Sequence, residues 1–386
     1  MRENNKLSTS SYFLLTCLLL ISNMQTTSPF SLYFLCIFVF GFLSLCFLLI
    51  NKKINTELLV CSLILISFLI FITILQIKNY ASYEGLTAII ISRLALAVYW
   101  GGLVGLSLGC ISNVSSSSMS KVVNFVIFIM SVFIFIQIAS HYFLGLNIDF
   151  SQMTGGGLSR SYYGEVYRPS GFLPEPAVFS GHMCALLALS LYYNKKLNFY
   201  FYFGTLAVLG TLSTVGIILC ACLYISFIMS VKNNLFSYII FFLFILLFSI
   251  FIFPSLADRY ELFINGVDSS NNLKIDAIKN FFGDKDIFLY GYGVIGRDHP
   301  LLPPYFEAIK DVTIFGAIFS VYGVVLGAVV FLLFVVVFIK SSLSFRSKII
   351  LTIPLMKLCT PSYAFFFIYL AIYFLILNSK PSQFVK

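Results

Sequence analysis

Residues 167–182, YRPSGFLPEPAVFSGH, combine ionisable side chains with residues that stiffen the backbone. The prolines exclude a regular helix, whereas Gly171 permits a turn, so Arg168 and Glu175 are expected on a rigid, irregular backbone. The planar guanidinium of arginine suits phosphate oxygens, and a carboxylate can accept a proton from a hydroxyl group. This segment is therefore the first candidate for a functional site.

Further charged and aromatic residues lie just before this segment. Arg160 and Glu165 stand beside Tyr162, Tyr163 and Tyr167. A tyrosine offers a ring face and a hydroxyl group, which suit a sugar ring, and Arg160 could bind an anionic group. Alternatively, Arg160 and Glu165 only keep the loop in water.

Two ionisable residues lie inside or at the start of long apolar runs. Arg93 belongs to IISRLALAVYW, and His182 follows soon after Pro176. If these runs cross a membrane, an ionisable side chain is costly unless it faces a cavity or a partner. For Arg93 the partner could be a protein carboxylate or a lipid phosphate, and His182 could instead be a packed histidine with its hydrogen bonds satisfied.

A second polar stretch, residues 255–311, begins with a predicted amphipathic helix. Leu273, Ala277, Ile278, Phe281 and Phe282 recur at helical spacing. Such a helix is expected to lie on a membrane surface or to cap a helical bundle.

The end of this stretch, GDKDIFLYGYGVIGRDHP, contains Gly291 and Gly293 and then Arg297 and His299. The glycines allow close backbone approach, but they do not lie in a strand–turn–helix unit, which argues against a dinucleotide site. The Asp284–Asp286 pair is too short a pattern to predict a metal site, and we expect no metal.

Composition decides the class of protein. Hydrophobic residues make up 60% of the 386 residues and charged residues only 10%, and the mean hydropathy is +0.98. A soluble domain carries about 25% charged residues, so the chain is predicted to be an all-α, polytopic membrane bundle. The net charge of +9 is concentrated in short loops and reports orientation, so we do not expect nucleic acid as a partner.

Apolar runs predict eleven or twelve transmembrane helices within one domain, residues 1–386. Lysine and arginine are enriched in the short loops on the N-terminal side, which places that side in the cytoplasm and both long loops, 145–176 and 255–311, outside. A helical hairpin should turn at residues 211–214, and the last run could be one kinked helix or two short ones. The runs expected to span are 7–24, 30–50, 58–77, 86–111, 122–143, 177–193, 199–212, 213–231, 236–254, 312–339 and 349–377.

The motif RPSGFLPEP resembles the R-x-x-G-x-x-x-E-P segment of bacterial polymerases in the O-antigen ligase/polymerase superfamily. Arg168, Gly171, Glu175 and Pro176 match that pattern in order and spacing. GTLSTVGI at 210–217 is similar to the serine-rich turn of these proteins. The second long loop resembles theirs through Lys274, Gly291, Gly293, His299 and Gly316.

The resemblance implies a glycosyltransferase of the inner membrane, with its long loops in the periplasm, that joins oligosaccharide units carried on undecaprenyl diphosphate. No cofactor is implied, because the donor is already energised; membrane lipid and a chain-length regulator protein are the implied further partners. Arg168, Glu175 and His299 would be catalytic. The residues that would bind substrate are Arg93, Arg160, Tyr167, Gly171, His182, Lys274 and Arg297.

Two other functions remain open. A ligase of the same superfamily usually carries a His-Asn pair, whereas here Pro300 follows His299 and lysine replaces the commoner arginine at 274, which favours a polymerase. A flippase for polyprenyl-linked oligosaccharides should carry ionisable residues in many spans and internal repeats. This chain concentrates its polar residues in two loops instead.

Overall fold

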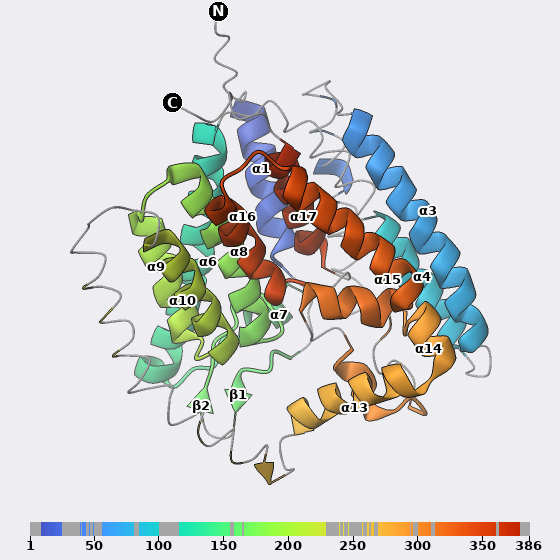
Figure 1. Ribbon diagram of the computed structural model, residues 1–386. Helices are drawn as coiled ribbons and strands as arrows, with labels where there is room; N and C mark the ends of the chain where they lie inside the picture. The colour runs from blue at the N-terminus through green and yellow to red at the C-terminus, as the bar shows by residue number, and fades with distance from the viewer. Residues whose placement is uncertain are drawn as a thin grey trace, which may run out of the picture.

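A computed structural model describes residues 9–24, 56–80, 85–99, 116–154, 158–163, 166–228, 269–293, 295, 300–309, 313–359 and 363–378, with single positions within 39–49 and 239–265. These residues are almost entirely helical (Figure 1). Within them, one short antiparallel hairpin pairs β1 (Tyr162–Tyr163) with β2 (Val166–Tyr167). The all-α prediction is confirmed for this part of the chain.

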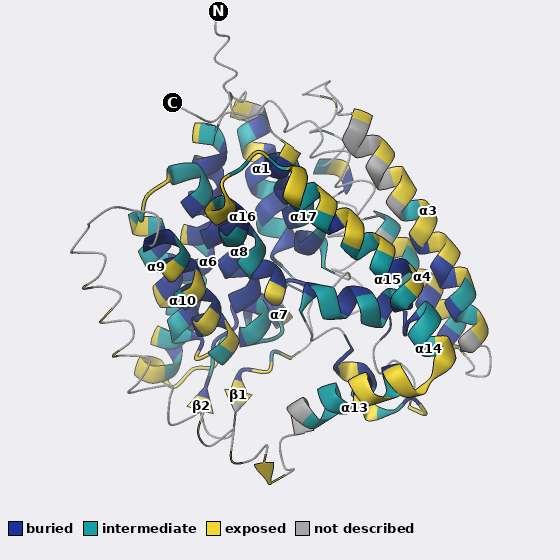
Figure 2. Ribbon diagram, viewed as in Figure 1, coloured by how far each residue is buried: buried dark blue, intermediate teal, exposed yellow. Residues whose placement is uncertain are grey.

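Helix α8 (Pro176–Asn194) lies at the centre of an inner bundle. Every residue from Phe179 to Leu191 is buried, and Figure 2 shows this core among α1, α6, α8 and α16. The helix begins at Pro176, whose fixed φ suits the first helical position. It ends at Asn194, and the next residue, Lys195, adopts a left-handed conformation with φ 53°.

Helix α8 packs against α6 (Ser116–Leu144), α9 (Phe199–Gly210), α10 (Thr214–Ile228) and α16 (Phe345–Thr352), whereas α1 (Thr9–Ser22) packs against α6. Asn198 caps α9 by accepting a hydrogen bond from the Phe201 amide at 2.9 Å. The predicted hairpin turn at 211–214 is confirmed, because α9 ends at Gly210 and α10 starts at Thr214. Gly216 brings α10 close to α8, since a Cβ there would lie 2.4 Å from Ser180.

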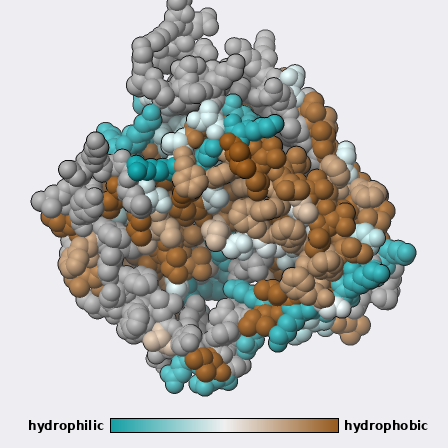
Figure 3. Space-filling view, in the orientation of Figure 1, coloured by the Kyte–Doolittle hydropathy of each residue, from teal (hydrophilic) through white to brown (hydrophobic). Residues whose placement is uncertain are grey.

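Three described helices are long and apolar enough to cross a membrane: α6, α8 and α15 (Ile314–Lys340). Shorter apolar helices occupy parts of the other predicted spans that the structure describes. Figure 3 shows apolar residues as a band across the visible face, with hydrophilic residues above and below it. The predicted spans 30–50 and 236–254, apart from a few helical positions in each, and the end of 86–111 lie outside the described residues.

A second, smaller core joins the second long loop to helices α3 (Thr56–Asn79) and α4 (Leu86–Tyr99). It includes residues from α13 (Ser269–Gly283), from the segment after α14 (Lys285–Tyr290), and from the short helix η3 (Pro304–Glu307). The predicted amphipathic helix is confirmed as α13. Its Ala277 and Phe281 are buried, whereas Phe282 is 71% exposed.

Helix α15 is broken at Gly323, which has φ 69° and ψ 178°. The break releases the carbonyl groups of Ser320 and Val321 from the helical pattern. The amides of Tyr292 and Gly293 donate to these two carbonyls at 2.7 and 3.0 Å. The prediction that Gly291 and Gly293 allow close backbone approach is therefore confirmed. The backbone that approaches them is that of α15 at its break.

The last apolar run, expected as one kinked span or two short ones, forms two separate helices. Helix α16 (Phe345–Thr352) continues into the 3-10 turn η4 (Ile353–Met356), and α17 (Ala364–Asn378) follows separately. Ser344 caps α16 by accepting from the Ser347 amide at 3.3 Å. Pro354 lies in the turn, where its missing N–H prevents a continuous helix.

Candidate functional site

The first long loop folds back on itself and so brings its charged residues to the start of α8. The Arg168 amide donates to the Ser161 carbonyl at 2.7 Å, and the Arg160 amide donates to the Pro174 carbonyl at 2.7 Å. These two bonds hold Arg160 and Ser161, the residues just before β1, against the RPSGFLPEP segment. Arg160 and Glu175, fifteen positions apart in sequence, thereby become neighbours.

Arg160 and Glu175 form an ion pair, with Nη1 and Oε1 3.1 Å apart. The Arg160 side chain is 74% exposed and that of Glu175 is 35% exposed, so both remain accessible to a ligand. Glu175 is the residue before the first turn of α8, but its side chain caps no amide. Its carboxylate therefore interacts with Arg160 and not with the helix end.

Arg168 connects the loop to the α9–α10 hairpin. Its Nε donates to the Thr211 carbonyl at 3.4 Å, and the Thr211 hydroxyl lies 3.2 Å from that of Ser180 on α8. The two motifs on which the family resemblance depends, around residues 168 and 211, are thus joined in space. The Arg168 side chain is half-buried, which restricts how its guanidinium can be oriented.

Gly171 has a structural role in this arrangement. It adopts φ 62°, a conformation that favours glycine, and its amide donates to the Gln137 side-chain oxygen at 2.8 Å. A bond to Gln137 of α6 leaves this N–H unavailable to a substrate. The prediction that Gly171 binds substrate directly has no support in this geometry.

Tyr167 is buried against His141, a residue that the sequence analysis passed over. The two rings stack with centroids 4.1 Å apart, and burial raises the pKa of Tyr167 to about 12. The ring face predicted to bind sugar is therefore taken by His141, whereas the neighbouring Tyr162 is 48% exposed. The only signal for His141 in the sequence was a histidine in the last turn of a predicted span.

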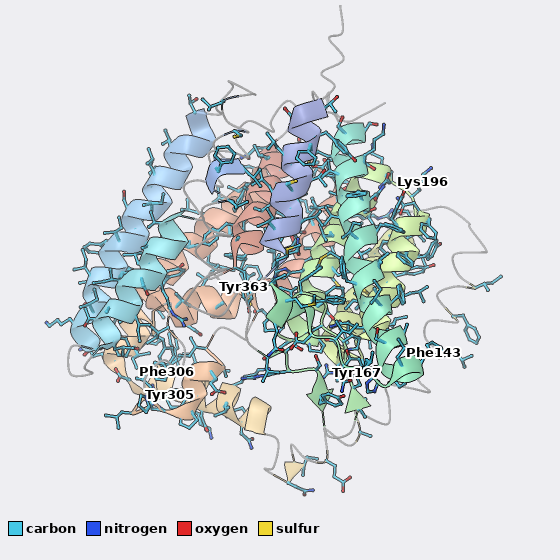
Figure 4. The ribbon with its side chains drawn as sticks, turned by 180° about the vertical axis from the view of Figure 1, so that it is seen from behind. Phe143, Tyr167, Lys196, Tyr305, Phe306 and Tyr363 are labelled. Carbon is cyan, nitrogen blue, oxygen red and sulfur yellow. The ribbon has the colours of Figure 1, made fainter. Side chains whose placement is uncertain are left out.

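His182 lies within α8, seven residues after Glu175, and is buried. Its Nδ1 is 3.0 Å from the Asn23 side-chain oxygen, and its ring stacks on Phe365 with centroids 4.8 Å apart. Tyr363 meets the same ring edge-on, and Figure 4 places Tyr363 near mid-height of the bundle. Among the described residues, His182 Nε2 has no hydrogen-bond partner. The alternative of a packed histidine with both hydrogen bonds satisfied therefore accounts for Nδ1 but not for Nε2.

The other predicted residues are not brought to this cluster. Arg93 lies on α4, which packs against α3 at the right edge of Figure 1, away from the β-hairpin at the bottom. Lys274 is on α13 and is half-buried. Arg297 and His299 lie outside the described residues, as does Glu165.

The two long loops lie at the same end of the bundle. In Figure 4, Tyr167 and Phe143 from the first loop region and Tyr305 and Phe306 from the second lie at one end, whereas Lys196 lies at the other. This arrangement agrees with the loop alternation expected from charge.

The described residues hold no group of three or more His, Cys, Asp or Glu side chains that could bind a metal ion. In the Asp284–Asp286 pair, Asp284 caps α14 by accepting from the amides of Asp286 and Ile287 at 2.9 and 3.1 Å. This pattern of acidic residues is therefore explained by a helix start.

No protein-family model matches the chain, and searches of the curated proteins and of the solved structures likewise find no match.

Proposed function

We propose that this chain is a polysaccharide polymerase of the bacterial inner membrane, a glycosyltransferase that joins oligosaccharide units carried on undecaprenyl diphosphate. One observation supports this proposal above the others: the ion pair of Arg160 and Glu175 lies where the loop enters α8, and the same loop carries Arg168, which is anchored to Thr211. Two arginines and one carboxylate on a stiff loop suit an anionic leaving group and a hydroxyl nucleophile.

The proposed reaction forms one bond and breaks another. A sugar hydroxyl of one unit attacks the anomeric carbon of the other, and the bond from that carbon to the diphosphate oxygen breaks. Arg168 and Arg160 would stabilise the negative charge that develops on the departing diphosphate. Glu175 would accept the hydroxyl proton, and no nucleotide or other cofactor is required because the diphosphate bond supplies the free energy.

Membrane placement is supported by three apolar helices of sufficient length and by the apolar band in Figure 3. Lys196, in a basic short loop, lies at the opposite end from Tyr167 (Figure 4). With the basic end in the cytoplasm, the Arg160–Glu175 pair would face the periplasm, where the lipid-linked unit is available.

The ligase and flippase alternatives predict different products. A ligase transfers the finished polymer to a lipid acceptor and shares much of this chemistry. A flippase moves the lipid-linked unit across the membrane and needs no catalytic carboxylate. The polar cluster described above lies at one end of the bundle and not along a path through it, which favours an enzyme.

The test is the lipopolysaccharide pattern of a strain that lacks the gene, complemented with wild type, Arg168→Lys, Arg168→Ala or Glu175→Gln. A polymerase predicts one repeat unit on the core in the deletion strain, a full ladder with wild type and a shortened or absent ladder with each variant. Arg346→Ala is the matched control, because Arg346 is an exposed arginine at the start of α16, away from the site.

Bare core with polymer retained on undecaprenyl diphosphate would indicate a ligase. Bare core with repeat units held in the cytoplasm would indicate a flippase. A full ladder with Arg168→Ala at normal membrane level would remove Arg168 from the proposed mechanism.

A further inference from the structure

The surface around the outer end of α6 carries many exposed apolar side chains. Phe143 is 85% exposed, and Val166 on the hairpin is 49% exposed. We call these residues the loop 1 apolar patch; its members are Phe143, Leu144, Leu146, Met153, Leu158, Tyr162 and Val166. A loop in water rarely exposes so many apolar groups together.

The patch continues an exposed stripe on α6. Lys121, Phe125, Phe128, Ile136, Ala139 and Phe143 are all exposed, and with the half-buried Val132 they recur every three or four residues. Residues at this spacing share one face of a helix, and the opposite face is buried against α8 and α9. In a membrane this stripe would be the lipid-facing side of α6.

The length of the stripe sets the depth of the patch. From Lys121 to Phe143 is 22 residues by subtraction of the numbers, or about 33 Å at about 1.5 Å per residue. The hydrocarbon core is about 30 Å thick, so a lysine at the cytoplasmic boundary places Phe143 at the outer boundary. The rest of the patch then lies at the level of the lipid headgroups.

The hairpin is held at this same level by its contacts with α6. Tyr167 stacks on His141, and the exposed Tyr162 meets Tyr167 with ring centroids 5.4 Å apart. In β2 the alternation directs Tyr167 inward and Val166 outward. The exposed Arg160 lies in the same loop, where its charge would meet lipid phosphates.

We infer that the loop 1 apolar patch is inserted in the outer leaflet, so that the hairpin and the Arg160–Glu175 pair lie at the level of the lipid phosphates. This inference relies on the membrane placement in the proposed function, but it does not depend on the reaction. Its consequence is that a lipid-linked diphosphate would reach Arg168 sideways from the leaflet and not from the water above.

The experiment places a single tryptophan at chosen positions in the purified full-length protein in phosphatidylcholine and phosphatidylglycerol vesicles. The chain has one tryptophan, Trp100, which is first replaced by phenylalanine. Probes are Phe125→Trp on the stripe, and Val166→Trp and Leu158→Trp in the patch. All three positions are exposed, so the larger ring does not overfill the core.

Emission is measured with lipids brominated near the headgroup and with aqueous iodide. For Val166→Trp and Leu158→Trp we expect about a twofold loss of emission with the brominated lipid and little loss with iodide. Loss with iodide alone at both positions would overturn the inference. Phe125→Trp separates this inference from the membrane placement in the proposed function. Its quenching by brominated lipid tests whether α6 lies in the membrane, and this result does not depend on the position of the hairpin.

Discussion

Replacement of Gly323 by alanine should release the second long loop from the broken helix α15. Gly323 has φ 69° and ψ 178°, a conformation that only glycine adopts readily, and a side chain there is strained by about 1–3 kcal/mol. An added Cβ would also lie 2.2 Å from the Leu289 carbonyl oxygen. The variant therefore cannot keep both the break and the present position of the Leu289–Gly293 segment.

The alternative open to the variant is a continuous α15. Alanine is favoured over glycine in a helix by about 1 kcal/mol, and a straight helix reclaims the Ser320 and Val321 carbonyls for its own amides. The Tyr292 and Gly293 amides would then lose their acceptors. Strain relief and helix propensity together favour the continuous helix, with the Leu289–Gly293 segment detached, by about 2–4 kcal/mol. The clash with the Leu289 carbonyl would add to this value.

Hydrogen exchange detected by mass spectrometry on the protein in nanodiscs would measure this change. A shift of about 3 kcal/mol corresponds to roughly a hundredfold loss of protection at residues 289–293. Gly291→Ala should act in the same direction, because its Cβ would lie 2.4 Å from the Gly323 nitrogen. Gly283→Ala is the matched control, since nothing lies within 4 Å of a Cβ there. Unchanged exchange in Gly323→Ala would refute the idea that the glycine break anchors this loop.

Three further changes test individual contacts. Gly216→Ala should lower stability by about 1–3 kcal/mol in thermal unfolding, because the new Cβ meets Ser180 at 2.4 Å; an unchanged melting temperature would contradict this. Gln76→Leu should lower it by a similar amount, about 1–3 kcal/mol, since Gln76 donates to the buried Val321 carbonyl at 2.7 Å, and Gln76→Glu should not restore the bond. Tyr167→Phe should be harmless at neutral pH. Because the folded pKa of Tyr167 is raised to about 12, wild type should lose stability as pH rises from about 10 through 12, and Tyr167→Phe should lose less; equal losses in alkaline unfolding would contradict the burial argument.

Helix positions could be predicted because they depend on neighbours in sequence. Apolar runs marked α6 and α8, Pro176 marked the start of α8, and the polar residues after Gly210 marked the hairpin turn. The amphipathic spacing of 273–282 likewise predicted α13. These signals act within a few residues, so the sequence contains them in full.

Which residues meet in the candidate site depended on contacts between distant segments. The sequence singled out Arg160, Arg168 and Glu175, but only folding shows that Arg160 pairs with Glu175 and that Arg168 reaches Thr211. For Gly171, only the folded position of Gln137 shows which group its amide bonds. His141 had no chemical context in the sequence, because its partner, Tyr167, is 26 positions away by subtraction.

The sequence by itself determined that this chain is helical and apolar, where most of its described helices begin and end, and which loop concentrates its charge. Only the tertiary structure decided that α15 is broken at Gly323, since a valine- and glycine-rich run is compatible with a straight helix. The break exists because its released carbonyls find the amides of Tyr292 and Gly293 and the side chain of Gln76. Such bonds join residues that local propensity cannot bring together, and buried polar groups must find partners wherever the fold places them.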